Sequence, residues 1–218
     1  MSAQIRVLEG KNHYRPESYF SLNVKNGVMR APTGQRMLTM PEDFLTGLHA
    51  GLEDETGQAA PVILYTVGKF WGRQFAKNHA QEIRSFYKKD AEELPTAFYL
   101  HVLRRAWGLY GWGHLDLSFE HQEHGFIEAI VDGALYSDAV GNVGRTTDHL
   151  VAGALASITS HIAGRDLECV EVACKSQGDA QCRFLVGMSQ RVDTVSQWVQ
   201  QKRSASEILA SVSAGELD

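Results

Sequence analysis

The chain has 218 residues, of which 44% are hydrophobic and 22% are charged, a composition that excludes a disordered or collagen-like protein. The net charge of −5, from 21 basic and 26 acidic residues, argues against a broad surface for nucleic-acid phosphates. Three cysteines are too few for a disulfide scaffold and fit a reducing compartment.

Targeting signals are the next feature of the sequence. The start of the chain, Met1–Arg6, lacks the apolar run of a signal peptide. No stretch of 18 apolar residues occurs, so no membrane span is predicted. We therefore expect a cytoplasmic protein without direct nucleic-acid or membrane contacts.

The first half of the chain predicts a hairpin followed by three helices. Asn26-Gly27 tolerates the positive φ angles of a tight turn, so residues 19–30 are predicted to form a hairpin. Helices are predicted from Pro41 to Gly57, from Pro61 onward, and after Pro95. Their apolar faces are predicted to contain Phe44, Leu45, Leu48 and Leu52 in the first helix, Leu64, Val67, Trp71 and Phe75 in the second, and Tyr99, Leu103, Ala106, Trp107 and Tyr110 in the third.

The second half alternates strands and helices. Strands are predicted over residues 115–119, 126–131, 167–174 and 181–186, a loop over 136–145, and helices from Thr146 or Thr147 to Gly164 and around Val192–Val199. Ser204–Glu207 has the pattern of a capping box that starts a short last helix. Hairpins joined by helices indicate an α+β fold, an antiparallel sheet packed against helices. We divide the chain into an arm (1–18), a ligand-binding domain (19–187) and a helical tail (188–218).

Catalytic signatures are scarce. The sequence contains no G-x-S-x-G elbow, phosphate-binding loop, H-E-x-x-H helix or dinucleotide fingerprint. His121 and His124 lie in a predicted turn, where polar residues are expected in any case. No catalytic residue is assigned, and a binding protein is favoured over an enzyme.

Aromatic residues gather in the middle of the chain, where 11 of the 20 lie between Tyr65 and Trp112. They form either a large aromatic core or the lining of a pocket for a flat apolar molecule. Gly68, on the same helix, permits either close helix packing or the approach of a ligand to the backbone. The candidate ligand-binding residues are Gly68, Trp71, Phe75, Phe98, Tyr99, Trp107 and Trp112.

The cysteines lie in the last predicted hairpin. Cys174 and Cys182 flank its turn, and thiolates combined with a carboxylate can complete a tetrahedral zinc site. Strict strand alternation puts Cys169 and Glu171 on the face opposite Cys174, so a shared site needs a twist or a bulge. The alternative is that the cysteines are small buried hydrophobic residues.

Three segments of this region resemble the C-terminal signature of the 4-vinyl reductase domain family: Gly164-Arg165, Glu171-Val172-Ala173-Cys174 and Gly178-Asp179-Ala180-Gln181-Cys182-Arg183-Phe184. Ile63 to Gly72 is similar to an upstream helix motif of the family, and the resemblance extends over about residues 20–187. It implies a fold like that of transport-particle (TRAPP) subunits and haem-based nitric-oxide sensors. It also implies the binding of a small hydrophobic molecule, often in a homodimer.

The resemblance further implies a metal site, because the phenol- and xylene-sensing branch of the family binds zinc through three cysteines and a glutamate. Glu171, Cys174 and Cys182 match three of these ligands, and Asp148 takes the position of the remaining cysteine. Asp148 can act as the fourth zinc ligand, or it can support the N-terminus of a helix.

Three functions follow from the resemblance. The first is a stand-alone sensor or carrier that encloses a hydrophobic, aromatic or tetrapyrrole-like ligand and signals through a separate protein partner. The second is a chaperone or reductase accessory in tetrapyrrole synthesis, with a tetrapyrrole as cofactor. The third is a dimeric scaffold subunit.

Overall fold

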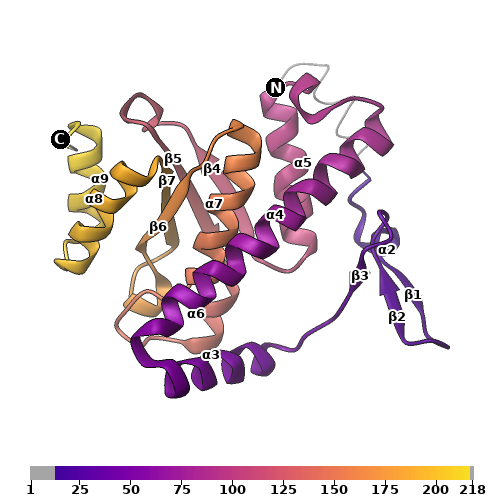
Figure 1. Cartoon of the computed structure of the whole chain (residues 1–218), viewed down its shortest axis with the longest axis horizontal. Helices are drawn as coiled ribbons and strands as arrows, with labels where there is room; N and C mark the ends of the chain where they lie inside the picture. Colours follow the sequence, from indigo (N-terminus) through magenta and orange to yellow (C-terminus); the bar gives the residue numbers. More distant parts are fainter. Residues whose placement is uncertain (1–12, 217–218) are drawn as a thin grey trace. The chain divides into compact units, whose positions relative to one another are not determined.

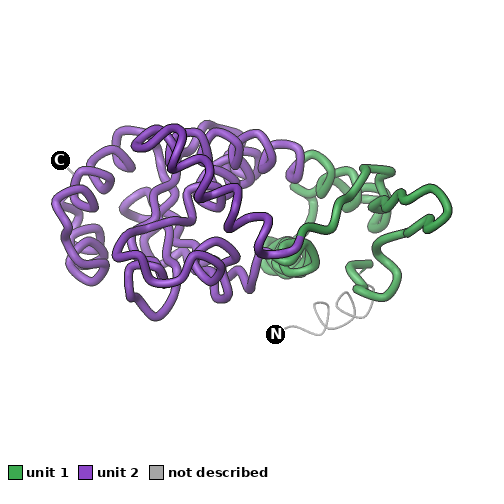
Figure 2. The backbone as a smooth tube through the Cα atoms, turned by 90° about the horizontal axis from the view of Figure 1, so that it is seen from below, with its two compact units in different colours: residues 1–40, 77–111 green, residues 41–76, 112–218 purple. Residues whose placement is uncertain are grey.

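The computed structural model describes residues 13–216, and these divide into two compact units (Figure 2). Unit 1 comprises residues up to Met40 together with Lys77–Gly111, and unit 2 comprises Pro41–Ala76 together with the chain from Trp112 onward. Residues 1–12, which include Met1–Arg6 and most of the predicted arm, lie outside the described residues. The predicted boundaries at 18/19 and 187/188 stay a prediction.

The sheet of unit 2 has four antiparallel strands in the order β4-β5-β7-β6. Its strands are β4 (His114–Ser118), β5 (Phe126–Asp132), β6 (Glu168–Ala173) and β7 (Cys182–Gly187). In β4 buried and exposed residues alternate, as the sequence pattern predicts for a strand with one solvated face. The predicted α+β class, with an antiparallel sheet packed against helices, is confirmed.

Helices cover this sheet. The apolar helix α7 (His149–Ala163) lies over β6 and β7 (Figure 1), and ten consecutive residues from Leu150 to Thr159 are buried. Helices α8 (Ser189–Gln200) and α9 (Ala205–Ser213) pack on Phe126, Val172 and Leu185 of the sheet. The predicted capping box is present, because the Ser204 hydroxyl accepts from the Glu207 amide.

Helices α3 (Glu42–Thr56) and α4 (Ala60–Tyr87) precede the sheet and are joined by a short 3-10 turn at Gly57–Ala59. The prediction for the apolar face of α3 is wrong at Phe44 and Leu48, which are exposed, whereas Leu45 and His49 are buried. In α4, Val67 is likewise exposed. The buried residues Leu45, Leu64, Tyr136 and Leu150 form a common core of α3, α4, α6 and α7.

Two glycines let α4 approach α7 closely. A side chain on Gly68 would collide with the carbonyl oxygen of Leu150, and one on Gly72 would lie 2.5 Å from the carbonyl oxygen of Ala154. Gly153 of α7 meets the Tyr65 carbonyl oxygen of α4 in the same manner. Of the two roles considered for Gly68, the structure therefore shows helix packing.

The predicted loop over residues 136–145 is wrong in its first part, where the helix α6 (Leu135–Val140) forms. Its amide-to-carbonyl bonds close a single turn and a half, and Tyr136 and Ser137 are buried under it. The periodicity of so short a helix is too brief to distinguish it from a loop.

Unit 1 contains a small antiparallel sheet in the order β1-β2-β3 and the helix α5 (Thr96–Leu109). Its other elements are α2 (Pro16–Tyr19), β1 (Ser21–Asn23), β2 (Val28–Arg30), β3 (Arg36–Met37), the end of α4 and a 3-10 turn at Ala91–Glu93. The predicted hairpin at Asn26-Gly27 is confirmed, with Gly27 at φ 60°. In neither unit does a described helix have the length and apolar composition needed to span a membrane.

Candidate metal site

Four ionisable side chains of unit 2 converge in the interior. Asp148 precedes the first residue of α7, Glu171 lies in β6, Cys174 directly follows β6, and Cys182 opens β7. All four residues are buried, and one ligand atom from each lies within 4.8 Å of the others. The structure thus brings together the four predicted metal-site residues into a group that can hold a metal ion.

A β-bulge makes this convergence possible. The pairing of β6 with β7 is regular from Glu168 to Glu171 and shifts between Glu171 and Ala173. Without the shift, Glu171 and Cys174 would lie on opposite faces of the strand. Cys169, before the bulge, pairs with Val186 and is not a member of the group.

The distances fit tetrahedral coordination. For zinc bonds of about 2.3 Å to sulfur and 2.0–2.2 Å to oxygen, tetrahedral angles require about 3.8 Å between two sulfurs and about 3.6 Å between sulfur and oxygen. The Sγ atoms of Cys174 and Cys182 are 4.0 Å apart. Asp148 Oδ2 lies 3.7 Å from the Cys174 sulfur and 3.3 Å from that of Cys182.

The carboxylates leave oxygen atoms free for a cation. Asp148 Oδ1 and Glu171 Oε1 are buried without a hydrogen-bond partner, while Glu171 Oε2 accepts from the Asp148 amide at 3.1 Å. Burial, together with the nearby Cys174, raises the pKa of Asp148 to about 6. Burial and the Asp148 charge also raise the pKa of Glu171. A divalent cation would offset this repulsion, so the donor set fits a metal.

The two thiols are joined by a hydrogen bond. The bond from Cys182 lowers the pKa of Cys174 to about 4, and the same bond raises the pKa of Cys182. One thiolate is therefore already favoured by the protein, and thiolates are the form in which cysteine binds metals. A metal would displace the remaining proton.

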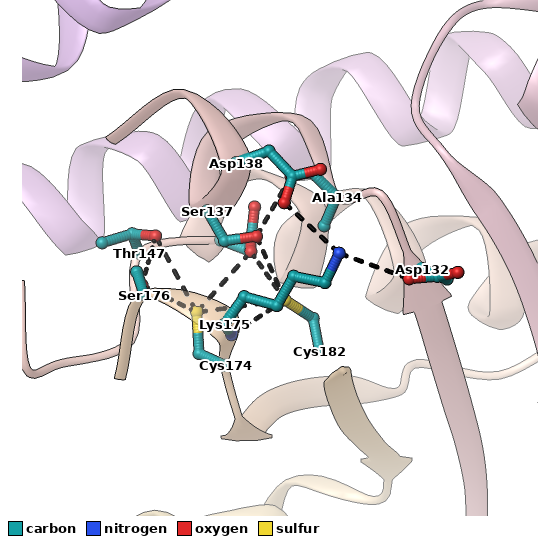
Figure 3. A network of polar contacts seen from close by, with 10 residues as sticks. Asp132, Ala134, Ser137, Asp138, Thr147, Cys174, Lys175, Ser176 and Cys182 are labelled. Carbon is teal, nitrogen blue, oxygen red and sulfur yellow. Dashed lines mark hydrogen bonds and ion pairs between the residues drawn. The ribbon is translucent and has the colours of Figure 1, made fainter. Parts of the chain in front are cut away.

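Polar neighbours hold the donor side chains in place (Figure 3). Ser137 of α6 lies 3.2 Å from the Cys182 sulfur, and Ser176 lies 2.9 Å from the Cys174 sulfur. The Ser176 hydroxyl donates to the Arg145 carbonyl oxygen at 2.8 Å, and Thr147 Oγ1 lies 2.9 Å from the same hydroxyl. Such outer partners orient metal ligands.

Lys175 ties the surrounding loop to α6. Its amide donates to the Cys182 sulfur at 3.5 Å, and its Nζ lies 3.3 Å from Asp132 Oδ1 and 3.4 Å from Asp138 Oδ1 (Figure 3). The sequence analysis missed Lys175, Ser137 and Ser176, because hydroxyl and lysine side chains carry no spacing signature. Only the position of Ser176 between Cys174 and Cys182 could have drawn attention to it.

The predicted ligand-binding residues fall into both units. In unit 2 the rings of Trp71 and Trp112 are 4.9 Å apart, and those of Trp71 and Phe75 are 5.2 Å apart. In unit 1, Phe98, Tyr99 and Trp107 belong to the buried face of α5. Their role in binding stays a prediction.

The comparisons with known proteins agree with this geometry. Residues 123–188 match the model of the vinyl-4-reductase domain, and this segment includes all four metal-site donors. No curated protein matches the chain in sequence. The chain therefore contains a vinyl-4-reductase domain over these residues, which confirms the resemblance to the 4-vinyl reductase family.

Solved structures extend the likeness beyond this segment. The phenol-responsive sensory domain of the transcription activator PoxR, crystallised with phenol, is 18% identical with a TM-score of 0.65, covering 91% of this chain and 94% of that one. The chain thus has the fold of that sensory domain.

Two further structures are less similar. A vinyl-4-reductase family protein from Methanocaldococcus jannaschii is 18% identical with a TM-score of 0.46, covering 69% of this chain and 82% of that one. Subunit 3 of a trafficking protein particle complex from Naegleria fowleri, covalently bound to palmitic acid, is 12% identical with a TM-score of 0.47, covering 68% and 95%. The predicted tetrapyrrole and homodimer find no support in these comparisons.

Proposed function

We propose that this protein is a sensor or carrier for a small aromatic molecule of the phenol class, with zinc bound by Asp148, Glu171, Cys174 and Cys182. The observation that carries the proposal is the fold shared with a phenol-responsive sensory domain over nine-tenths of both chains. The matched vinyl-4-reductase segment and its metal-binding group support it.

The role of the metal in this proposal is structural. Zinc supplies strong bonds to two thiolates and two carboxylates, and all four positions of a tetrahedral ion are then filled by protein. The donors belong to the start of α7, to β6 and to the turn before β7, so they fasten the β6–β7 hairpin to the helix above it. Ser137 and Lys175 connect α6 to the same group.

The aromatic group of unit 2 is the proposed place of ligand contact. Trp71 is half-buried and has Phe75 and Trp112 as ring neighbours, an environment that suits a flat apolar molecule. A phenol has one polar group and a small aromatic ring, so most of its surface would be desolvated against such side chains.

Titration of the full chain with phenol, followed by tryptophan fluorescence, tests this proposal. We expect a saturable change, and a loss of affinity of about 10-fold or more in Trp71→Ala, because the ring contact is removed. Cyclohexanol, which has the hydroxyl but no aromatic ring, serves as the comparison ligand.

Trp198→Ala is the matched control. Trp198 is also half-buried in unit 2, but its ring stacks on Arg203 at 4.6 Å beside the α8–α9 core. We expect this variant to bind phenol as the wild type does. Absence of saturable binding, or an equal loss in both variants, would overturn the proposal.

A further inference from the structure

Unit 1 contains a cavity of its own, distinct from the metal site and from the aromatic group of unit 2. Its volume is about 280 Å³, and it is open to solvent on one side. Residues near the start of the described chain and the end of α4 form its walls. Those used below are His13, Tyr19, Thr33, Glu82 and Phe86.

A buried carboxylate belongs to this cavity. Glu82 is 3% exposed, its Oε1 accepts from the Tyr19 hydroxyl at 2.8 Å, and its Oε2 lies 3.4 Å from His13 Nε2. Within residues 13–216 no lysine or arginine forms an ion pair with it. Glu82 is therefore a buried anion whose one ionic partner is a histidine, which is charged only when protonated.

The tyrosines around Glu82 are hydrogen-bond donors without charge. Burial, with the nearby Glu82, raises the pKa of Tyr14, and burial raises the pKa of Tyr19 as well. Both hydroxyls therefore stay protonated. They stabilise the carboxylate but supply no positive charge to balance it.

Two polar atoms of the cavity walls have no partner. The side chain of His13 is 9% exposed and its Nδ1 makes no hydrogen bond, and Thr33 Oγ1 is likewise buried and unbonded. When His13 Nε2 carries the proton toward Glu82, Nδ1 is left as a hydrogen-bond acceptor. The cavity therefore offers acceptors on a histidine, a threonine and a carboxylate.

Aromatic faces complete the lining. The His13 and Phe86 rings stack with centroids 4.6 Å apart, and Phe86 keeps 48% of its surface exposed. Tyr19 lies on the same cavity. Aromatic faces attract cations, and they also shelter the apolar body of an organic ligand.

We propose that this cavity binds a small organic cation, a primary ammonium carried on a short apolar or aromatic body. The ammonium has three N–H donors and no acceptor, which complements the acceptors of Glu82, His13 and Thr33. Its positive charge neutralises the buried Glu82, and its apolar body lies against Phe86 and Tyr19. A cavity of about 280 Å³ limits the ligand to a small molecule.

Isothermal titration calorimetry of the full chain at pH 7 tests this assignment with 2-phenylethylammonium and its neutral analogue 2-phenylethanol as probes. We expect the ammonium to bind at least about 10-fold more tightly than the alcohol, because the paired charge is buried. Glu82→Gln keeps the size of the side chain and removes the charge, so it should abolish this preference.

Two further variants make the outcome decisive. Glu55→Gln alters the net charge equally at an exposed position of α3 in unit 2 and should leave both affinities unchanged. Phe86→Ala removes a half-exposed ring that the fold does not need and should weaken the ammonium about 3-fold or more. Equal binding of amine and alcohol by the wild type overturns the proposal, as does ammonium binding that survives Phe86→Ala and, where Glu82→Gln folds, that variant too.

Discussion

At the scale of the residue, the metal-binding group differs from the pattern that the family resemblance implies. Asp148 stands where a cysteine is expected, so the group offers two sulfur and two oxygen donors. A carboxylate reaches the centre of the group from the N-cap position of α7, where an acidic side chain is also favourable for the helix. The two roles considered for Asp148 are therefore compatible.

Removal of one thiol should remove the metal. In Cys182→Ala the Sγ atom 3.3 Å from Asp148 is lost, and the remaining three donors leave one tetrahedral position unfilled. We expect the zinc content of the purified protein, measured by elemental analysis or native mass spectrometry, to fall by about 10-fold or more.

Cys169→Ala provides the matched comparison for that prediction. Cys169 is as buried as the site cysteines, in the same strand as Glu171, but it is not a member of the donor group. This variant should retain the metal of the wild type. A zinc content that depends on Cys169, or that does not depend on Cys182, would contradict the assigned ligands.

At the scale of the element, the contact between α4 and α7 depends on glycines. Gly68→Ala would place a methyl group against the backbone of Leu150, and a backbone atom cannot move aside as a side chain can. We expect the free energy of unfolding, from urea denaturation, to fall by about 1–3 kcal/mol or more.

Gly51→Ala is the control for this effect. Gly51 lies in the helix α3 with open space around it, so an added methyl group meets no other atom. Because alanine restricts the unfolded chain, the variant should be more stable by about 0.4–1 kcal/mol. Opposite signs for the two variants are the expected result, and the same sign in both would mean that the helices do not pack as described.

The β6–β7 hairpin shows how a single irregularity sets a site. The bulge between Glu171 and Ala173 reverses which face the following residues occupy, and it thereby adds Cys174 to the side of Glu171. Asp179, which is also acidic and nearby, instead accepts from the Cys174 amide at 2.9 Å and closes the turn. Proximity in sequence therefore did not distinguish the ligand from the turn residue.

At the scale of the whole molecule, the division into two units predicts a local response to metal removal. All four donors lie in unit 2, and stripping zinc from the loaded protein leaves them buried without a counter-charge. We expect hydrogen exchange after chelation to rise in the β6–β7 hairpin, in α6 and at the start of α7. Exchange in α5 of unit 1 should stay unchanged, and a uniform rise over both units would contradict a role limited to unit 2.

The sequence by itself determined the class of fold, most element boundaries and the candidates for the four metal-site donors. Alternation, helical spacing and capping residues are local signals, and the family signature preserves the spacing of Glu171, Cys174 and Cys182. Only the tertiary structure decided that Asp148 joins them, that α6 forms beside them, and that Gly68 packs against a helix far along the chain. The cavity beside Glu82 likewise depends on contacts between distant segments, and such contacts leave no periodic pattern along the chain.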